Sequence, residues 1–361
     1  MKHNLLLIIG LIAFLFPMSL KAQETPKISG FVQGLYEAHL AKESGLIDNT
    51  LRMRRVRVSL DGNFTDAISY KIQGDFSRSP MLVDAYVKYK ASKAFAIQVG
   101  QFKMPFSMES PINPVNLEIF DYGESVQSLV GYKDICGVGS LGRDLGVMAS
   151  GEFLQLEGKD YPLITYNIGL FNGNGANKLD NNNRKDLVGR LDVHPMMKEL
   201  TLSGSFYLGK YNNETEGDSG TRNRWSAGAQ YKDGNIMVRA EYLSGTTGHT
   251  YYDGVINDNN EYIEVEKQLF QLSQGYYALA GYTFHFGKGF SQKITPVVRF
   301  EHFAPGDFEE RGSVSTNYYT VGFDYWPVKS LNFKLDYSLV QEYFGESYNS
   351  HRIVGILSYK F

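Results

Sequence analysis

The stretch SLNFKLDYSL, residues 330–339, alternates apolar and polar side chains with a period of two. Phe333 and Leu335 occupy one parity, and Lys334 and Asp336 occupy the other. Because successive side chains of a strand point to opposite faces, the stretch predicts a strand with one apolar and one polar face. The same alternation recurs in AISYKIQGDF, LTLSGSFYL and NIMVRAEYL, and no sustained helical period accompanies it. The chain is therefore expected to be all-β.

The predicted strands are mostly about ten residues long, the length that a tilted strand needs to cross a bilayer. Strands of globular proteins usually have about five or six residues. A soluble sandwich or propeller is the alternative, but no blade-length repeat favours it. The pattern predicts a transmembrane antiparallel β-barrel of about sixteen strands, with these expected bounds: 28–39, 51–62, 67–77, 81–90, 94–103, 143–152, 161–171, 185–194, 199–210, 222–232, 235–244, 275–286, 294–303, 316–326, 330–342 and 350–361.

The connections between these segments alternate in length, as they do in outer-membrane barrels. Short turns such as KDGN and WPVKS alternate with long polar stretches, among them 172–184 and 245–274. The longest connection, 104–142, contains Pro105, Pro111 and Pro114, which suit a stiff irregular path better than a strand.

Charged residues inside the predicted strands lie on the polar parity. A cation on the lipid face near the bilayer midplane costs about 2–4 kcal/mol, so the polar parity must face a wet lumen. Nearly as many carboxylates share this parity, which supports a polar channel better than a strongly anion-selective one. Two interpretations stay open, since the cations either line an anion path or pair with carboxylates and hold the barrel shape. The candidate pore-lining cations are Arg55, Arg57, Lys71, Lys88, Arg190, Arg239, Arg299 and Lys334.

The two ends of the chain also carry signals. Residues 1–22 contain an apolar run after Lys2 and read as a secretory signal peptide cleaved near Ala22, which leaves 23–361 as the barrel. The chain ends in RIVGILSYKF, with Tyr359 and Phe361 on the apolar parity. This segment is expected to be the last strand, closing on the first, because an unpaired edge in hydrocarbon is costly. The terminal Phe resembles the assembly signal of bacterial outer-membrane barrels, whose termini are periplasmic.

Composition excludes several function classes. With 36 Lys+Arg against 39 Asp+Glu and a net charge of -3, no basic field points to nucleic acid. A single cysteine cannot form an intrachain disulfide, and the seven histidines show no metal-ligand spacing, so neither metal nor cofactor is expected. No local signature groups a nucleophile with an acid and a base, so the protein is not expected to be an enzyme.

Three stretches resemble one family: LRMRRVRVSLDGNF (51–64), the segment from LVDAYVKYK to MPFSMES (82–110) and GRDLGVMASGEF (142–153). They resemble the phosphate-selective porin O and P family, the sixteen-stranded anion-preferring porins of Gram-negative outer membranes, in a form similar to members from Bacteroidetes. The resemblance implies a homotrimer, basic side chains along an anion path, and a loop folded inward as pore constriction, here 104–142.

These observations predict an outer-membrane porin that allows passive diffusion of small hydrophilic solutes, with anions such as phosphate expected. Arg52 and Arg54 share the lipid parity and are expected at the outer rim, where they could attract anions or lipopolysaccharide phosphates. Other expected partners are outer-membrane lipid and the barrel-assembly machinery. The alternative is a non-conducting barrel that acts as an adhesin or surface receptor through the 172–184 and 245–274 loops.

Overall fold

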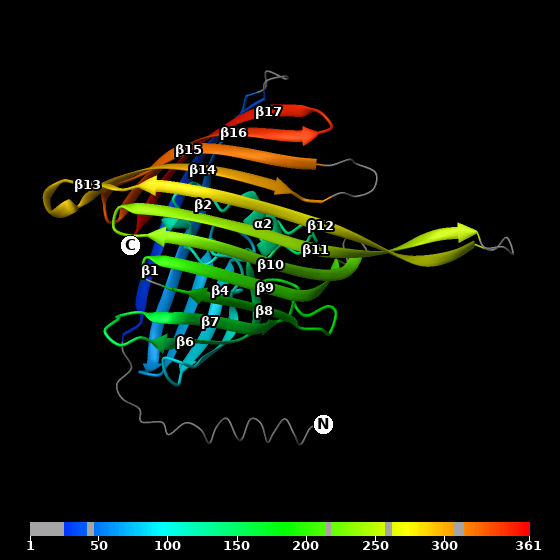
Figure 1. Ribbon diagram of the computed structural model, residues 1–361, viewed down its shortest axis with the longest axis horizontal. Coiled ribbons are helices and arrows are strands. Elements are labelled where there is room, and N and C mark those ends of the chain that lie inside the picture. Colours follow the sequence, from blue (N-terminus) through cyan, green and yellow to red (C-terminus); the bar gives the residue numbers. More distant parts are fainter. Residues whose placement is uncertain (1–24, 42–46, 196, 214–217, 257–261, 307–313) are drawn as a thin grey trace.

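The computed structural model describes residues 25–41, 47–195, 197–213, 218–256, 262–306 and 314–361. These residues form a closed antiparallel β-barrel (Figure 1), as expected. Seventeen strands fill sixteen positions in the wall, because β12 and β13 are consecutive pieces that both pair with β14. The strands are β1 (Lys27–Ala41), β2 (Ile47–Thr65), β3 (Ile68–Asp75), β4 (Leu82–Lys90), β5 (Ala96–Lys103), β6 (Arg143–Gln155), β7 (Pro162–Phe171), β8 (Asp186–Val193), β9 (Leu200–Asn213), β10 (Asp218–Lys232), β11 (Ile236–Ile256), β12 (Tyr262–Tyr282), β13 (Phe284–Phe286), β14 (Gln292–Ala304), β15 (Val314–Val328), β16 (Leu331–Phe344) and β17 (Ser347–Lys360).

The last strand closes the barrel against the first. Pairing between β1 and β17 runs from Phe31 opposite Lys360 to Ala41 opposite Ser350. Beyond the end of β17, Phe361 continues the ladder: its backbone carbonyl accepts from Gly30 N at 3.0 Å, and its N–H donates to Gly30 O at 3.1 Å. Closure leaves no free sheet edge, which is what the hydrocarbon core of a bilayer requires.

Side-chain burial in the barrel is inverted relative to a soluble protein. In the 330–339 stretch, Lys334 and Asp336 on the inside are each 1 % exposed, whereas Phe333 and Leu335 on the outside are each 38 % exposed. The wall thus presents apolar side chains outward and polar side chains inward, as the alternation predicted.

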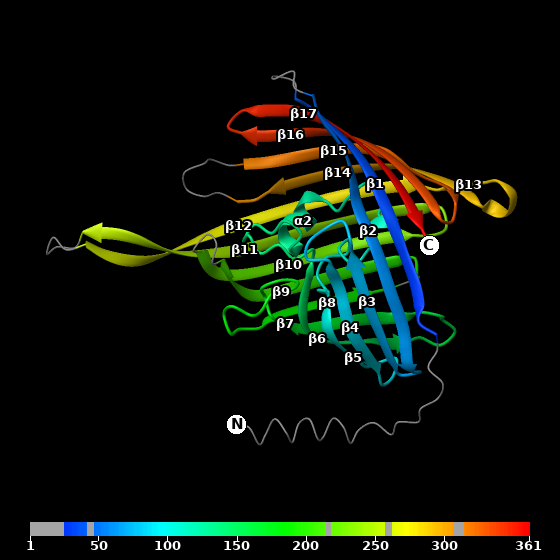
Figure 2. The same ribbon diagram turned by 180° about the vertical axis from the view of Figure 1, so that it is seen from behind.

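The connection between β5 and β6 fills much of the lumen. It carries a short 3₁₀ turn, η1 (Pro114–Asn116), and a two-turn helix, α2 (Glu124–Val130), which lies within the ring of strands in Figure 2. Its apolar side chains form the main buried cluster together with wall residues; Phe106 and Leu129 of the loop and Leu243 of the wall are all fully buried. We call residues 104–142 the inward loop.

One long polar connection differs from expectation. The 245–274 stretch is not a loop, because β11 and β12 each extend to 21 residues and pair as far as Ile256 opposite Tyr262. In Figure 1 this β11–β12 ribbon projects well beyond the other strands. Strand pairing therefore continues beyond the apolar band, because the polar residues of this stretch form strands and not a loop.

The ends of the barrel are distinguished by their connections. At the turn end lie the short turns and both the start of β1 and Phe361; at the loop end lie the inward loop and the β11–β12 ribbon. None of the helices in the described ranges is long and apolar enough to cross a membrane. The expected signal peptide, 1–22, lies outside the described residues.

Candidate functional site

The inward loop is fastened to the barrel wall by hydrogen bonds to several strands. Near its start, Ser107 Oγ donates to Glu241 Oε2 on β11 at 2.9 Å, and the Ser107 carbonyl accepts from Arg190 Nη1 on β8 at 2.8 Å. Further along, Phe120 N donates to Asp336 Oδ2 on β16 at 2.7 Å. Since these strands lie apart around the barrel, the loop spans the lumen.

A buried carboxylate, Glu109, is the main ionic anchor of the inward loop. Its Oε1 accepts from Arg299 Nη1 at 2.5 Å and from Arg239 Nη2 at 3.2 Å, and its Oε2 accepts from Gly123 N at 2.9 Å. Arg239 also donates to Glu118 Oε2 at 2.9 Å. Two of the predicted pore-lining cations, Arg239 and Arg299, are therefore engaged by loop carboxylates.

A second ionic anchor holds the far half of the loop. Arg224 on β10 donates through both terminal nitrogens to Asp134, at 2.7 and 2.8 Å, and also to the Leu129 carbonyl at 2.6 Å. Burial alone would raise the pKa of Asp134, but Arg224 and the neighbouring Arg222 hold that pKa below its ordinary value. The carboxylate therefore stays ionised and bound to the wall at neutral pH.

A third anchor joins the loop to β2. Asp121 Oδ2 lies 2.5 Å from Arg54 Nη2, and its Oδ1 lies 3.3 Å from Arg55 Nη2. Arg54 also donates to the Phe120 carbonyl at 2.6 Å. Burial opposes ionisation of Asp121, yet the two guanidinium groups lower its pKa below the ordinary value.

The inward direction of Arg54 corrects the expectation that it sits at the outer rim. The β1–β2 register shifts after Gln33, which pairs with Arg55, so that the next residue, Gly34, pairs with Met53. Arg54 is the extra residue of this β-bulge, and a bulge re-aims the side chain that it carries. The same shift corrects Arg52, which pairs with the buried Leu35 and so lies on the lumen parity, with its exposed side chain 3.7 Å from Glu37.

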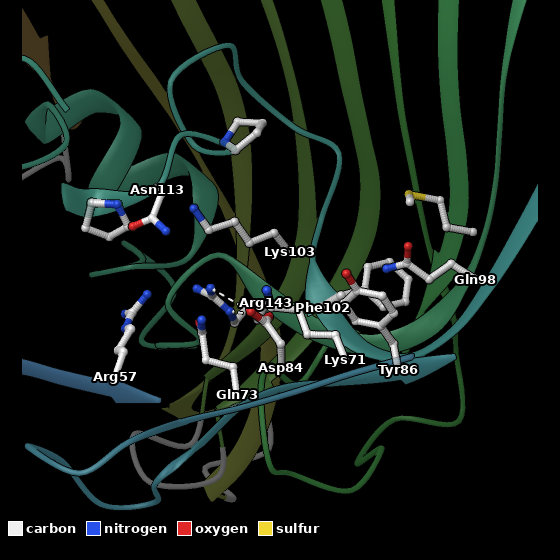
Figure 3. A pocket seen from close by; sticks show the side chains of 13 residues that line it. Arg57, Lys71, Gln73, Asp84, Tyr86, Gln98, Phe102, Lys103, Asn113 and Arg143 are labelled. Carbon is white, nitrogen blue, oxygen red and sulfur yellow. Dashed lines mark hydrogen bonds and ion pairs between the residues drawn. The ribbon is translucent and has the colours of Figure 1, made fainter. Parts of the chain in front are cut away.

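A cavity of about 240 Å³ lies between the inward loop and the wall of β2 to β6; we call it the turn-side cavity. Arg57, Lys71, Lys103 and Arg143 line it, with Asp84 as the only lining carboxylate among the described residues. Figure 3 shows the Lys103 ammonium directed toward the inward loop near Asn113, with the Arg143–Asp84 pair and Arg57 below it. The lining is therefore rich in cations.

Most of these cations are paired. Arg143 Nε lies 2.7 Å from Asp84 Oδ1, Arg57 Nε lies 3.0 Å from Asp75, and Lys71 lies 3.0 Å from Asp61. Lys103 differs, because within the described ranges it has no carboxylate partner. Its ammonium instead donates to the Tyr122 hydroxyl at 2.9 Å and to the Ile112 and Ser110 carbonyls.

A second cavity, of about 180 Å³, lies between residues 119–133 of the inward loop and the wall of β1, β2, β14, β15 and β17. We call it the loop-side cavity. Its lining includes Phe120 and Glu124 of the inward loop and Tyr318 and Arg352 of the wall. The two cavities share no lining residue, and the Asp121 anchor borders the second. The two cavities therefore border different parts of the inward loop: the turn-side cavity borders 111–114 and the loop-side cavity borders 119–133.

The remaining predicted site residues fall in different surroundings. Lys334 donates to the loop carbonyls of Val115, at 3.2 Å, and Leu117, and Arg190 also lies 2.8 Å from Asp192. The side chain of Lys88 on β4 makes no hydrogen bond or ion pair in the described part of the chain. At the barrel seam, Tyr359 and Phe361 are both 53 % exposed on the outer face.

Sequence reasoning missed four central residues: Lys103, Glu109, Asp121 and Arg143. All except Asp121 lie in stretches that carried the family resemblance, which was a usable signal. The parity rule could not find them, because three belong to the loop or its junction with β5, and Arg143 sits at the first position of β6, where the chain leaves the loop.

A closed sixteen-position barrel with a polar lumen and a loop folded across it is the architecture of a porin. The model of the family "Phosphate-selective porin O and P" matches residues 28–352, nearly the whole sequence, and the chain belongs to this family of outer-membrane porins. Family and fold are those of a channel rather than of an enzyme. A comparison with curated proteins found no match.

Solved structures share the fold at low sequence identity. An anion-selective porin from Comamonas acidovorans is 11% identical, with a TM-score of 0.63 over 93% of this chain and 99% of that chain. The outer membrane channel DcaP of Acinetobacter baumannii is 16% identical, with a TM-score of 0.61 over 93% and 97%. The trimer form of OmpT from Vibrio cholerae is 11% identical, with a TM-score of 0.61 over 94% and 100%.

Proposed function

We propose that this porin conducts small hydrophilic solutes by passive diffusion and prefers anions, phosphate among them. The observation that carries the proposal is the turn-side cavity, where four cationic side chains and one carboxylate line the space beside the inward loop. Basic side chains at a constriction attract anions and repel cations. Guanidinium groups also match the geometry of phosphate oxygens.

The same geometry limits the strength of the expected selectivity. Asp61, Asp75 and Asp84 neutralise three of the four cations, and the ammonium of the fourth, Lys103, is taken up by hydrogen bonds to the inward loop. Lys88, further toward the turn end, is partly exposed and has no counter-charge in the described residues. We therefore expect a modest anion preference, with the inward loop setting pore width and Lys88 contributing most to the sign of the preference.

The proposal includes an arrangement in the membrane. With the turn end in the periplasm, both termini are periplasmic after cleavage of the signal peptide near Ala22, and the inward loop is reached from outside. The OmpT structure in trimer form supports a homotrimer here. Arg52 lines the loop-side cavity beside Glu37, so the proposal places it along the solute path and not against lipopolysaccharide.

The experiment is single-channel recording in a planar bilayer under a KCl gradient, with and without phosphate. Discrete steps, a chloride-favouring reversal potential and current reduction by phosphate are expected. Lys88→Glu should shift the chloride to potassium permeability ratio toward potassium by about twofold, the size expected for a partly exposed charge. Lys329→Glu, on an exposed turn outside the cavities, is the matched control. Steps with no chloride preference would leave a general porin.

The projecting β11–β12 ribbon favours a second candidate function. A two-stranded ribbon that leaves the barrel wall lacks the packing that stabilises a sheet, and such surfaces often bind partners. If correctly folded, heat-modifiable protein gave no channel steps, a surface receptor or adhesin that acts through this ribbon would replace the channel.

A further inference from the structure

The loop-side cavity contains two opposite charges that do not pair. Most charged side chains in its lining are already matched: Arg54 with Asp121 at 2.5 Å, and Arg299 with Glu301 at 3.3 Å. Arg52 and Glu37 form a further, longer pair. In the described part of the chain, neither Glu124 on α2 nor Arg352 on β17 forms an ion pair or a side-chain hydrogen bond, with each other or with other groups.

Aromatic rings hold Arg352 in place. Its guanidinium carbon lies 4.4 Å from the ring centroid of Phe120 and 5.8 Å from that of Tyr318, and its Nε is buried without a hydrogen-bond partner. Cation–π contacts orient a guanidinium without consuming its N–H donors. The guanidinium is therefore held in position while its N–H groups remain available to a ligand. An arginine in a structural ion pair would have its N–H groups occupied.

Glu124 supplies the complementary charge from the loop. It is half-buried in the first turn of α2, and its backbone neighbour Ser125 is fixed by hydrogen bonds to Glu301 at 2.9 and 2.8 Å. The carboxylate is thus presented from a fixed backbone. Burial raises its pKa, with Glu301 acting in the same direction and Lys133 and Arg352 opposing, so its environment lacks a full compensating partner.

We propose that the loop-side cavity is a recognition site for small zwitterionic solutes, with Arg352 receiving a carboxylate and Glu124 receiving an ammonium group. The proposal rests on the channel function and names a substrate class for it. A cavity of about 180 Å³ suits a small molecule of the size of a simple amino acid rather than a drug-sized ligand. A solute that carries both charges can pair with both side chains. A simple anion would leave Glu124 without a counter-charge and would be repelled by its carboxylate.

Lys133 is the other lining cation without an ion pair in the described ranges, and its side chain is exposed. A long exposed lysine side chain loses more conformational freedom on binding than a stacked guanidinium does. We therefore assign the carboxylate contact to Arg352.

The test uses the full-length mature protein in liposomes and planar bilayers. Swelling rates are measured with L-alanine as the zwitterion, lactamide as a neutral solute of similar size, and sodium lactate as the anion. L-alanine is expected to enter faster than lactamide and to reduce single-channel KCl current. Arg352→Gln and Glu124→Gln should each lower the alanine to lactamide ratio by about threefold, the size of one partly exposed charge contact.

Matched variants keep the result interpretable. Arg352→Lys and Glu124→Asp retain the charges and should preserve most of the preference, and heat-modifiable migration reports folding for every variant. Glu157→Gln and Lys329→Gln, on exposed turns at the other end, should leave the ratio unchanged. Lys133→Gln, in the cavity lining, should lower the ratio by less than Arg352→Gln does; a loss as large as that of Arg352→Gln would overturn the assignment to Arg352.

Two failures are distinguishable. If wild-type protein shows channel steps but L-alanine enters no faster than lactamide, or if lactate alone is favoured and Glu124→Gln raises lactate entry, the zwitterion site is wrong and the channel stands. If folded protein shows neither steps nor solute entry, the channel function itself has failed.

Discussion

Arg299 on β14 and Glu109 of the inward loop are 190 positions apart in sequence, and their Nη1 and Oε1 atoms lie 2.5 Å apart in the centre of the barrel. Both side chains are almost wholly buried. A buried charge pair holds position strongly because either partner alone would be an uncompensated charge in a poorly hydrated space. This pair therefore fixes where the loop crosses the lumen.

Glu109→Gln should destabilise the folded barrel by about 1.5–3 kcal/mol, because Arg239 and Arg299 each lose one charged hydrogen bond and keep Glu118 and Glu301 as counter-charges. The temperature at which the barrel loses heat-modifiable migration should fall, and channel noise should rise as the loop loosens. Glu157→Gln, an exposed carboxamide substitution, serves as control. An unchanged transition temperature together with unchanged channel noise would show that the other loop contacts hold the inward loop in place without Glu109.

Asp121→Asn should increase anion preference. Two guanidinium groups, Arg54 and Arg55, lose their shared carboxylate, so an uncompensated charge appears beside the loop-side cavity. We expect the chloride to potassium permeability ratio to rise by about twofold. The reversal potential under a KCl gradient measures it, with Asp66→Asn on the exposed β2–β3 turn as control. A ratio that stays constant would mean that the two arginines are screened from the ion path.

Acidification should act in two steps. Burial raises the pKa of Glu124 above the ordinary glutamate value of about 4.3, so its charge is lost first as pH falls. Asp121 and Asp134 have lowered pKa values, so the stability that their ion pairs contribute is present above the unfolded value of about 3.9 and is lost only below it.

Current reduction by L-alanine should therefore disappear at a higher pH than the pH at which loop fluctuations appear in single-channel records. The groups that face Glu124 are Lys133, Glu301, Arg352 and Asp121, and none of them reverses this order. Glu124→Gln should abolish the first step alone. Simultaneous loss of both properties, or the reverse order, would contradict the assignment.

Deletion of Phe361 should reduce the yield of assembled barrel severalfold. It removes both backbone hydrogen bonds to Gly30 and the outer ring that packs at the seam. Gly30→Val is a second route to the same defect, because a Cβ there would lie 2.5 Å from the Phe361 ring and 2.4 Å from the Arg57 carbonyl. The readout is heat-modifiable protein in outer-membrane fractions. Normal amounts in both variants would contradict a closing role for this contact.

The alternation of apolar and polar residues in the sequence predicted most of the fold. All sixteen expected strands are present, and the lumen parity holds for Arg57, Lys71 and Lys334, because side-chain direction in a strand depends only on position along it. The parity rule failed at the β-bulge, which turned Arg54 inward. A second prediction was wrong for another reason, because the regular β11–β12 ladder continues into the 245–274 stretch that was expected to be a loop.

The sequence by itself determined the wall, its inside and outside, and the closure at Phe361, since each follows from the period of two and from the cost of unpaired backbone in hydrocarbon. Only the tertiary structure decided which lumen cations form ion pairs with carboxylates of the inward loop. Arg239 and Arg299 meet Glu109, Arg54 meets Asp121, and Arg352 lies against the aromatic rings of Phe120 and Tyr318. These pairings depend on distances between residues far apart in the chain, which no local pattern encodes.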